Sequence, residues 1–350
     1  MRSSHLILLS AVTSLAVIGA AISLGTNVGP SLPERNGEAV YPGLKDALPS
    51  ISQVRLKTPL IDFTFESDGA LWRVKERDGF PADMQKLAET VFALSDLTYV
   101  EPKTANPERY ARLQIEDPFA EGAASRGIQI MGSNGDVLVD LIAGRRKFDL
   151  SSGTATRGLY IRKPGDDRGW LAAGTLSLSD DAETWLDEVL LTIDPMRMRR
   201  AVLVHRDGER VEIVRGAASD PYRAITIPKG STPKKESSRA NIATVLENFT
   251  LHDVARLSDL SFVGGENVDT LFETFDGLTV SARLLRAASD GDEAQYWAMI
   301  SARADDDSPD AVKAEAAALN AKAEGWIFRI PTWKSAQMVK RNIDLIETGE

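Results

Sequence analysis

Histidine is the first residue type to consider for chemistry, because imidazole serves as a metal ligand and as a general acid or base. The chain has three histidines, His5, His205 and His252, and no cysteine. A zinc site usually takes three or four ligands from His, Cys and carboxylates, and this chain offers few of them. We therefore interpret each histidine as a structural or surface residue and predict no metal centre.

Acidic residues gather in two places where their oxygens are candidate calcium ligands. They are Asp305, Asp306, Asp307 and Asp310, and Asp290, Asp292 and Glu293. The spacing of an EF-hand is missing from both groups. Asp310 follows Ser308-Pro309 at an expected helix start, where exposed N–H groups stabilise a carboxylate. We predict a solvated helix cap for the first group and a turn for the second.

Aromatic residues in the last quarter of the chain raise the question of a sugar cleft with paired carboxylates. They are Tyr296, Trp297, Trp326 and Trp333. Their positions at expected strand and helix starts favour core packing, since one indole buries a large apolar area. No two carboxylates stand out as acid and base, and the motifs of common hydrolases and nucleotide-binding proteins are missing. We therefore name no catalytic, metal-ligating or cofactor-binding residue, expect no cofactor, and favour a protein that is not an enzyme.

The composition is that of a folded globular body, with 43% hydrophobic and 26% charged residues. The net charge of −10 argues against a nucleic-acid partner, whose phosphates attract clustered Lys and Arg. Three basic stretches, at residues 145–147, 197–200 and 229–235, are candidates for contact with anionic lipid or polymer. Because long acidic stretches separate them, we interpret them as solvated loops.

The elements that must position these side chains follow an apolar N-terminal run. Residues 6–24 carry no charged side chain, and about 20 apolar residues suffice for a helix to cross a bilayer. The run exceeds the apolar core of an ordinary signal peptide, which favours a retained anchor, while Gly-Ala-Ala at residues 19–21 leaves cleavage open. Arg2 precedes the run and Arg35 is the only nearby basic residue after it, so charge directs the body outward. We expect a cytoplasmic start at residues 1–5.

Residues 25–52 are rich in proline and glycine and are predicted to be a spacer. After the spacer the same order of elements occurs twice, which is the sign of an internal repeat. Asp68-Gly69 and Asp207-Gly208 each suit a tight hairpin turn. The flanking strand-like segments are residues 62–65 and 71–75, and residues 201–205 and 210–214. We therefore divide the body into a first unit at residues 53–194 and a second at 195–350.

A helix is predicted after each of these hairpins. Its apolar stripe is Met84, Leu87, Val91 and Leu94 in the first unit, and Ile242, Val245 and Phe249 in the second. Further hairpins are expected at Asn134-Gly135 and Asp276-Gly277. Residues 216–236 and 305–324 depart from the repeat, and the second segment has an acidic start followed by an alanine-rich helix. Each is a candidate projecting surface element, but we interpret both as tolerated surface loops. The predicted fold class is α+β: an N-terminal transmembrane helix, then two similar units of mostly antiparallel sheet with packed helices.

Several short segments resemble a known bacterial family, the domain of unknown function 4340. They are Leu71-Trp72-Arg73-Val74, Phe80-Pro81-Ala82-Asp83, a helix end with Leu94 and Leu97, and Leu113-Gln114-Ile115-Glu116-Asp117-Pro118. The resemblance covers most of residues 54–190 and extends more loosely into the second half. It implies an envelope protein with an N-terminal membrane helix, encoded beside ABC-transporter subunits and gliding-motility-type proteins, and it transfers no catalytic residue.

Two functions from different classes follow. The first is a membrane-anchored accessory or binding module of the bacterial envelope, without catalysis. It is held in the inner membrane by a single pass through residues 6–24, has its body on the periplasmic side, and binds a protein of a transporter-type or gliding-motility-type complex. The alternative is a periplasmic hydrolase or ligand-binding protein that uses a cleft between the two halves. The first predicts copurifying membrane subunits, and the second predicts converging polar groups in a deep pocket.

Overall fold

The computed structural model describes residues 35–148, 157–288 and 294–347. In these ranges strands outnumber helices, and the strand pairs of both large sheets are antiparallel. The predicted α+β class with mostly antiparallel sheets is therefore confirmed. The predicted anchor at residues 6–24 lies outside the described ranges, and no helix within them is long and apolar enough to cross a membrane.

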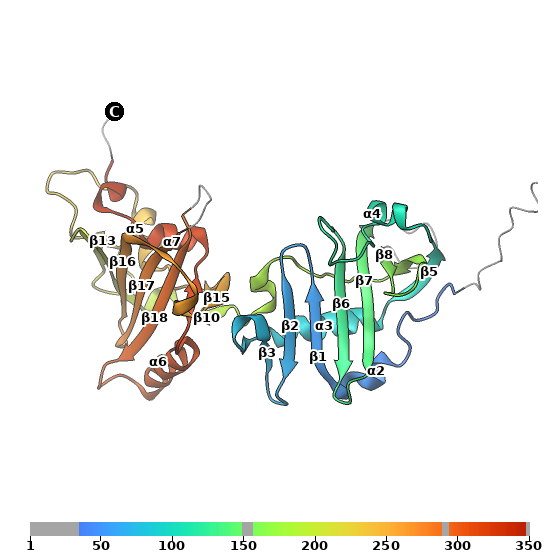
Figure 1. The fold of residues 1–350 in the computed structure, drawn as a ribbon. Helices are drawn as coiled ribbons and strands as arrows, with labels where there is room; N and C mark the ends of the chain where they lie inside the picture. Colours follow the sequence, from blue (N-terminus) through green and yellow to red (C-terminus); the bar gives the residue numbers. More distant parts are fainter. Residues whose placement is uncertain (1–34, 149–156, 289–293, 348–350) are drawn as a thin grey trace, which may run out of the picture.

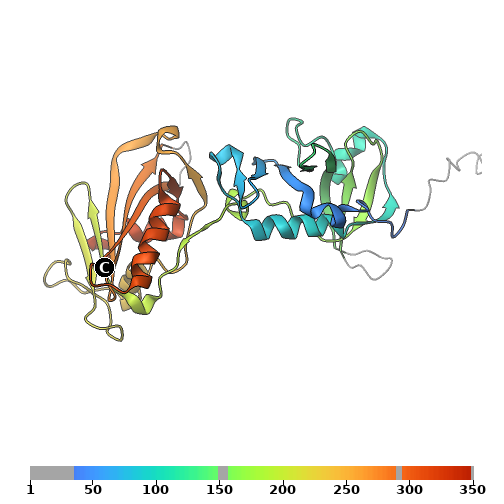
Figure 2. The same ribbon diagram turned by 90° about the horizontal axis from the view of Figure 1, so that it is seen from below.

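The first large sheet is built from residues 51–173. Its strands are β1 (Ile51–Lys57), β2 (Asp62–Ser67), β3 (Trp72–Val74), β4 (Phe80–Pro81), β5 (Thr98–Pro102), β6 (Arg126–Gly132), β7 (Val137–Lys147), β8 (Gly158–Arg162) and β9 (Gly169–Ala173). In space they follow the order β4-β3-β2-β1-β6-β7-β8-β9-β5. Its helices are α2 (Leu44–Ala47), α3 (Met84–Ser95) and α4 (Tyr110–Leu113). Helix α3 covers one face of this sheet, the rear face in Figure 1 and the lower face in Figure 2.

The second large sheet is built from residues 198–329. Its strands are β11 (Met198–His205), β12 (Arg210–Val214), β13 (Arg223–Ala224), β15 (Asp253–Ala255), β16 (Phe262–Thr274), β17 (Leu278–Ala287), β18 (Tyr296–Ala304) and β19 (Ile327–Arg329). Their spatial order is β13-β12-β11-β16-β17-β18-β19-β15. The accompanying helices are α5 (Glu236–Ala243), α6 (Asp310–Ala323) and α7 (Thr332–Met338), and a separate strand pair joins β10 (Val189–Leu191) to β14 (Phe249–Thr250).

The two sheets have the same strand order when β1, β2 and β3 are placed against β11, β12 and β13, with β4 as an additional edge strand. The registers of the β1–β6 and β11–β16 pairs also agree. Gln53 of β1 pairs with Met131 directly after a bulge, and Arg200 of β11 pairs with Glu273 directly after a bulge. The predicted correspondence was therefore one hairpin out of step, because it matched β11 and β12 with β2 and β3.

Part of the predicted spacer at residues 25–52 belongs to the fold. Val40 and Leu44 are buried in the core of the first sheet, and β1 begins at Ile51. The alanine-rich helix predicted within residues 305–324 is confirmed as α6. The interpretation as a tolerated loop is wrong, because α6 packs on β18 and buries Val312 and Leu319.

The two predicted helices differ in outcome. Helix α3 begins after Asp83, whose carboxylate accepts a hydrogen bond from Lys86 N at 2.9 Å, an N-cap interaction. It buries the predicted Leu87, Val91 and Leu94, while Met84 is 49% exposed. The second stripe does not lie on one helix. Ile242 is in α5, but α5 ends at Ala243, before Val245 and Phe249. Val245 and Phe249 are nevertheless buried, so the apolar pattern predicted their burial and not their secondary structure.

The two halves meet at one edge of each sheet. The ring of Phe80, in β4, lies 5.4 Å from that of Trp326 and 6.2 Å from that of Phe328. Beside them, the Arg77 guanidinium binds the Asp253 carboxylate through two hydrogen bonds of 2.6 and 3.0 Å. Packed rings and a bidentate ion pair therefore fill this junction.

Candidate binding surface

The outer face of the first sheet, opposite α3, carries polar side chains. Strand alternation directs Val54 and Leu56 into the core and leaves Arg55 and Lys57 on the outer face. The chain between β5 and β6, which includes α4, lies over part of this face. Its Tyr110 and Ile115 form a small apolar cluster with Ile142 of β7.

Glycines in the sheet allow this overlying chain to approach closely. A Cβ at Gly144 would lie 2.3 Å from the carbonyl oxygen of Leu113, and one at Gly169 would lie 2.4 Å from Cδ1 of Ile115. Neither distance is compatible with a side chain. The segment that resembles the family motif, residues 113–118, is thus held against the sheet.

Beside this segment is a cavity of about 310 Å³ on the outer face, which we call the first hollow. The residues that matter for its chemistry are Arg55, Lys57, Phe119, Gln129, Asp140 and Arg162. They come from β1, β6, β7, β8 and the segment before β6, so residues far apart in the chain meet here. The Phe119 ring is 58% exposed, with the Arg55 guanidinium 5.0 Å and Lys57 Nζ 5.8 Å from its centre.

The cations of the first hollow are incompletely neutralised. Arg55 makes two long hydrogen bonds of 3.3 Å to Asp62. Arg162 donates to the carbonyl oxygens of Ile115 at 2.9 Å and Asp166 at 3.3 Å. Within the part of the chain that the structure describes, neither Lys57 nor Arg162 forms an ion pair with a carboxylate.

Two acids line the first hollow, Asp140 and Asp117, and Asp117 Oδ1 accepts a hydrogen bond from Phe119 N at 2.9 Å. Asp140 is half-buried, and its burial raises the pKa of its carboxyl, an effect that a hydrogen bond from Gln129 Nε2 at 3.4 Å partly opposes. A carboxylate that loses water in this way binds its proton more tightly. Its partner is an amide, so the hollow contains no paired acid and base at this position.

The equivalent place on the second sheet is also hollow, with a volume of about 650 Å³. We call it the second hollow. The strand registers place Val202, Val204 and Leu271 where the first sheet has Arg55, Lys57 and Gln129. Through the next strand pair, Ser281 takes the place of Asp140. The centre of the second hollow is therefore mainly apolar.

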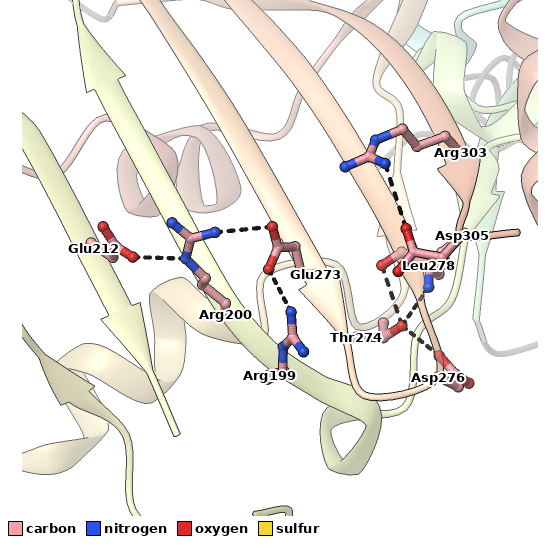
Figure 3. Close-up of polar contacts among 9 residues, drawn as sticks. All are labelled: Arg199, Arg200, Glu212, Glu273, Thr274, Asp276, Leu278, Arg303 and Asp305. Atoms are coloured by element: carbon pink, nitrogen blue, oxygen red, sulfur yellow. Dashed lines mark hydrogen bonds and ion pairs between the residues drawn. The ribbon is translucent and has the colours of Figure 1, made fainter. Parts of the chain in front are cut away.

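The charges around the second hollow neutralise one another. Figure 3 shows Arg200 between two carboxylates, with Nε 2.7 Å from Glu212 and Nη1 3.0 Å from Glu273. The second oxygen of Glu273 accepts from Arg199 at 3.0 Å. On the neighbouring strands Arg283 binds Asp269 at 2.6 Å. Each of these cations has a carboxylate partner.

The residues considered from the sequence are scattered. His205 is buried with Nε2 3.0 Å from the Lys340 carbonyl oxygen, and the His252 backbone N–H donates to Arg329 O at 2.8 Å. His5, Asp290, Asp292 and Glu293 lie outside the described ranges. Over the described residues no three His, Cys, Asp or Glu side chains group as metal ligands.

The predicted roles of the acidic and aromatic groups are partly confirmed. Asp310 is the first residue of α6, as expected for a helix start. Trp297 is buried and Trp326 packs against the core, as predicted. Trp333 is 64% exposed, so the prediction that it packs in the core is wrong. The stretch at residues 197–200 is not a set of solvated cations, since Arg197 binds Asp276 and Glu315, each at 2.8 Å.

Residues 113–118, beside the first hollow, are one of the segments that resemble the family. Comparison with known families confirms this resemblance. The family model of a domain of unknown function (DUF4340) matches residues 72–274, more than half of the chain. The chain belongs to this family. The DUF4340 match begins in β3, ends in β16 and includes residues 113–118. No curated protein and no solved structure matches the chain.

Proposed function

We propose that this DUF4340 protein is a non-catalytic binding module of the bacterial envelope. Residues 6–24 anchor it in the inner membrane with its body on the periplasmic side, and it serves a protein complex of the ABC-transporter or gliding-motility type. The uncharged apolar run supports the anchor. The first hollow supports binding, and the observation that carries the proposal is the pair Lys57 and Arg162, which have no carboxylate partner among the described residues.

Such a surface suits recognition of a partner. Arginine and aromatic residues are enriched in protein interfaces, where an aromatic ring supplies buried area and a cation supplies directional hydrogen bonds. Phe119 offers a largely exposed ring beside Arg55 and Lys57. A partner that covers this ring would bury its apolar area, and an acidic group on the partner would reach Lys57, which has no carboxylate partner among the described residues.

We also propose that the body consists of two similar units derived from one ancestral unit. The shared strand order and the bulge at the same place in β1 and β11 support this proposal. Similar units need not bind alike, since the side chains of the two hollows differ.

The alternative, a hydrolase or ligand-binding protein with a cleft between the halves, has less support. The junction contains the packed rings of Phe80, Trp326 and Phe328 and the Arg77–Asp253 ion pair. The first and second hollows are each lined from one half of the chain.

Crosslinking in the native membrane tests the proposed function. The full-length protein is crosslinked in intact cells, purified and analysed for attached membrane subunits. A Lys57→Glu variant is compared with Lys75→Glu, which changes a lysine that directly follows β3 and lies outside the hollow. We expect a reproducible partner that Lys57→Glu loses and Lys75→Glu retains. Capture that is equal for both variants, or a body that protease reaches only after the inner membrane is opened, would contradict the proposal.

A further inference from the structure

We infer that the first hollow binds a carboxylate carried next to an apolar group, as on an acidic side chain or chain end of a partner protein. This inference rests on the proposed binding function and names the chemistry of its ligand. It follows from the cations, the exposed ring, the size of the cavity and the contrast with the second hollow.

The cations provide the anion site. Lys57 and Arg162 have no carboxylate partner among the described residues, and Arg55 is held only by long contacts to a half-exposed Asp62. A carboxylate that enters the hollow therefore meets donors that are not already committed to another anion. Hydrogen bonds between ionised groups are about twice as strong as those between neutral groups.

The ring and the cavity size define the rest of the ligand. Phe119 is 58% exposed, and Pro118 and Pro164 add apolar surface at the rim. A volume of about 310 Å³ is at the lower end of the range for ligand pockets and fits one side chain. A single anionic group with an attached apolar or aromatic group satisfies both features.

Asp140 restricts the charge that the hollow accepts. Its carboxyl lies in the floor beside Gln129, with no cation paired to it among the described residues. Asp117 also lines the hollow. A ligand with one negative charge can use the cations on the rim, whereas a dianion such as phosphate meets greater repulsion from these two acids. The hollow should therefore prefer a carboxylate to inorganic phosphate.

The second hollow provides an internal control. Its equivalent positions are Val202, Val204 and Leu271, and the neighbouring Arg200 is already bound by two carboxylates. It has the same place on a similar sheet and a larger volume, yet each arginine that lines it is already bound by a carboxylate. The predicted anion affinity therefore belongs to the side chains of the first hollow and not to the shape of the sheet.

Ligand titration of the purified full-length protein tests the inference. The probes are 3-phenylpropionate, its neutral amide, inorganic phosphate, and a short peptide with an Asp-Phe sequence, each followed by NMR shifts or calorimetry. We expect 3-phenylpropionate to bind, the amide and phosphate to bind at least about tenfold more weakly, and Lys57→Gln to weaken 3-phenylpropionate by about tenfold. Lys75→Gln is the matched control. A peptide that binds more tightly than 3-phenylpropionate indicates a protein source, and equal affinity indicates a free carboxylate.

Three results would overturn the inference: equal binding of the amide, equal weakening by Lys75→Gln, or absence of binding in a protein that still captures its membrane partner. Phe119→Ala guards against misfolding as an explanation, since its ring is largely exposed and its loss should weaken binding without lowering stability. Binding of 3-phenylpropionate by a protein that captures no partner would instead refute the proposed function alone.

Discussion

The first and second hollows lie at equivalent places on two sheets of the same strand order, and their chemistry is opposite. The first has Arg55 and Lys57 where the second has Val202 and Val204. In the second hollow the nearest arginines are bound by glutamates on the neighbouring strands, whereas Lys57 has no such partner among the described residues. A shared backbone thus determines where a hollow forms, and the side chains determine whether it can bind an anion.

The overlying chain is the second difference. Twenty-odd residues between β5 and β6 cover part of the first face, while β15 and β16 are joined by a much shorter connection. Loops that lie on a rigid sheet commonly carry binding residues. The chain between β5 and β6 contributes Phe119 to the first hollow. The connection between β15 and β16 supplies no residue to the lining of the second hollow.

Replacement of Gly144 is the strongest test of this cover. In Gly144→Ala the new Cβ would lie 2.3 Å from Leu113 O and 2.7 Å from Gln114 O, both backbone atoms that a rotamer change does not move. We expect a loss of roughly 3 kcal/mol in the free energy of unfolding, because the segment must move away from the sheet. Denaturant unfolding measures the loss.

Gly127→Ala is the graded control for that variant. Its Cβ would meet the side chain of Pro118 at 2.9 Å, so a smaller shift relieves the clash. Equal stability of Gly144→Ala and wild type would show that the segment rests on the sheet less closely than we describe.

Lys334 extends the comparison to a buried cation, which also has no ion pair among the residues that the structure describes. It is 1% exposed, and Nζ donates to the carbonyl oxygens of Val245 and Glu247, each at 2.7 Å. Burial lowers its pKa to about 8, an effect that the charge of Glu247 partly opposes. We interpret it as a structural residue that satisfies the two carbonyl groups after α5.

The pH dependence of unfolding tests that interpretation. Because the folded pKa is below the ordinary lysine value of about 10.4, the unfolded chain holds the proton more tightly between these values. Stability should therefore rise as pH increases from about 8 toward 10. Lys334→Met should lose about 1–2 kcal/mol from the unpaired carbonyls and remove this rise. If stability rises equally with pH in the wild type and in Lys334→Met, another titratable group causes the rise.

Local chemistry made the hairpins predictable from the sequence. Gly135 and Gly277 adopt φ values of 86° and 89°, which favour glycine, so the turn dipeptides were sufficient. The predicted correspondence was one hairpin out of step, because it matched the Asp-Gly turn at residues 68–69, between β2 and β3, with the turn at residues 207–208, between β11 and β12. Nothing in the spacing of prolines and glycines reveals that Val40 and Leu44 are buried.

The first hollow was not predictable in the same way. Lys57 and Arg162 are separated by about a hundred residues, and only the pairing of β1 with β6, β6 with β7 and β7 with β8 brings them together. The predicted candidates for anion contact were runs of adjacent basic residues, whereas Lys57 has no basic neighbour in the sequence and Arg162 has only Lys163. The one available signal was that Arg55 and Lys57 alternate with buried Val54 and Leu56.

Asp140→Asn should strengthen anion binding in the first hollow. The substitution removes a negative charge, so we expect about threefold tighter binding of 3-phenylpropionate at neutral pH. Burial raises the pKa of Asp140. As the pH falls toward this pKa, the carboxyl loses its negative charge, so the wild type should bind the anion more tightly, and the variant should not. A phenylalkyl sulfonate, which stays ionised, isolates this effect from protonation of the ligand. Weaker binding in Asp140→Asn would mean that the acid contacts the ligand directly.

The variant with the smallest expected effect makes the second hollow more like the first. Glu273→Gln removes the carboxylate that Arg199 and Arg200 share, while Arg200 keeps Glu212. The network is partly buried, with 14% of the Glu273 side chain exposed, but Arg200 keeps its second partner, so we expect a stability loss of about 1 kcal/mol. The freed guanidinium groups should give the second hollow a weak affinity for 3-phenylpropionate, visible as NMR shifts in β11 and β16. Glu38→Gln, which breaks a 2.8 Å pair with Arg35, is the control and should produce no such shifts. If Glu273→Gln leaves the second hollow as inert as before, free cations alone do not create the site, and the ring of Phe119 must be the decisive difference.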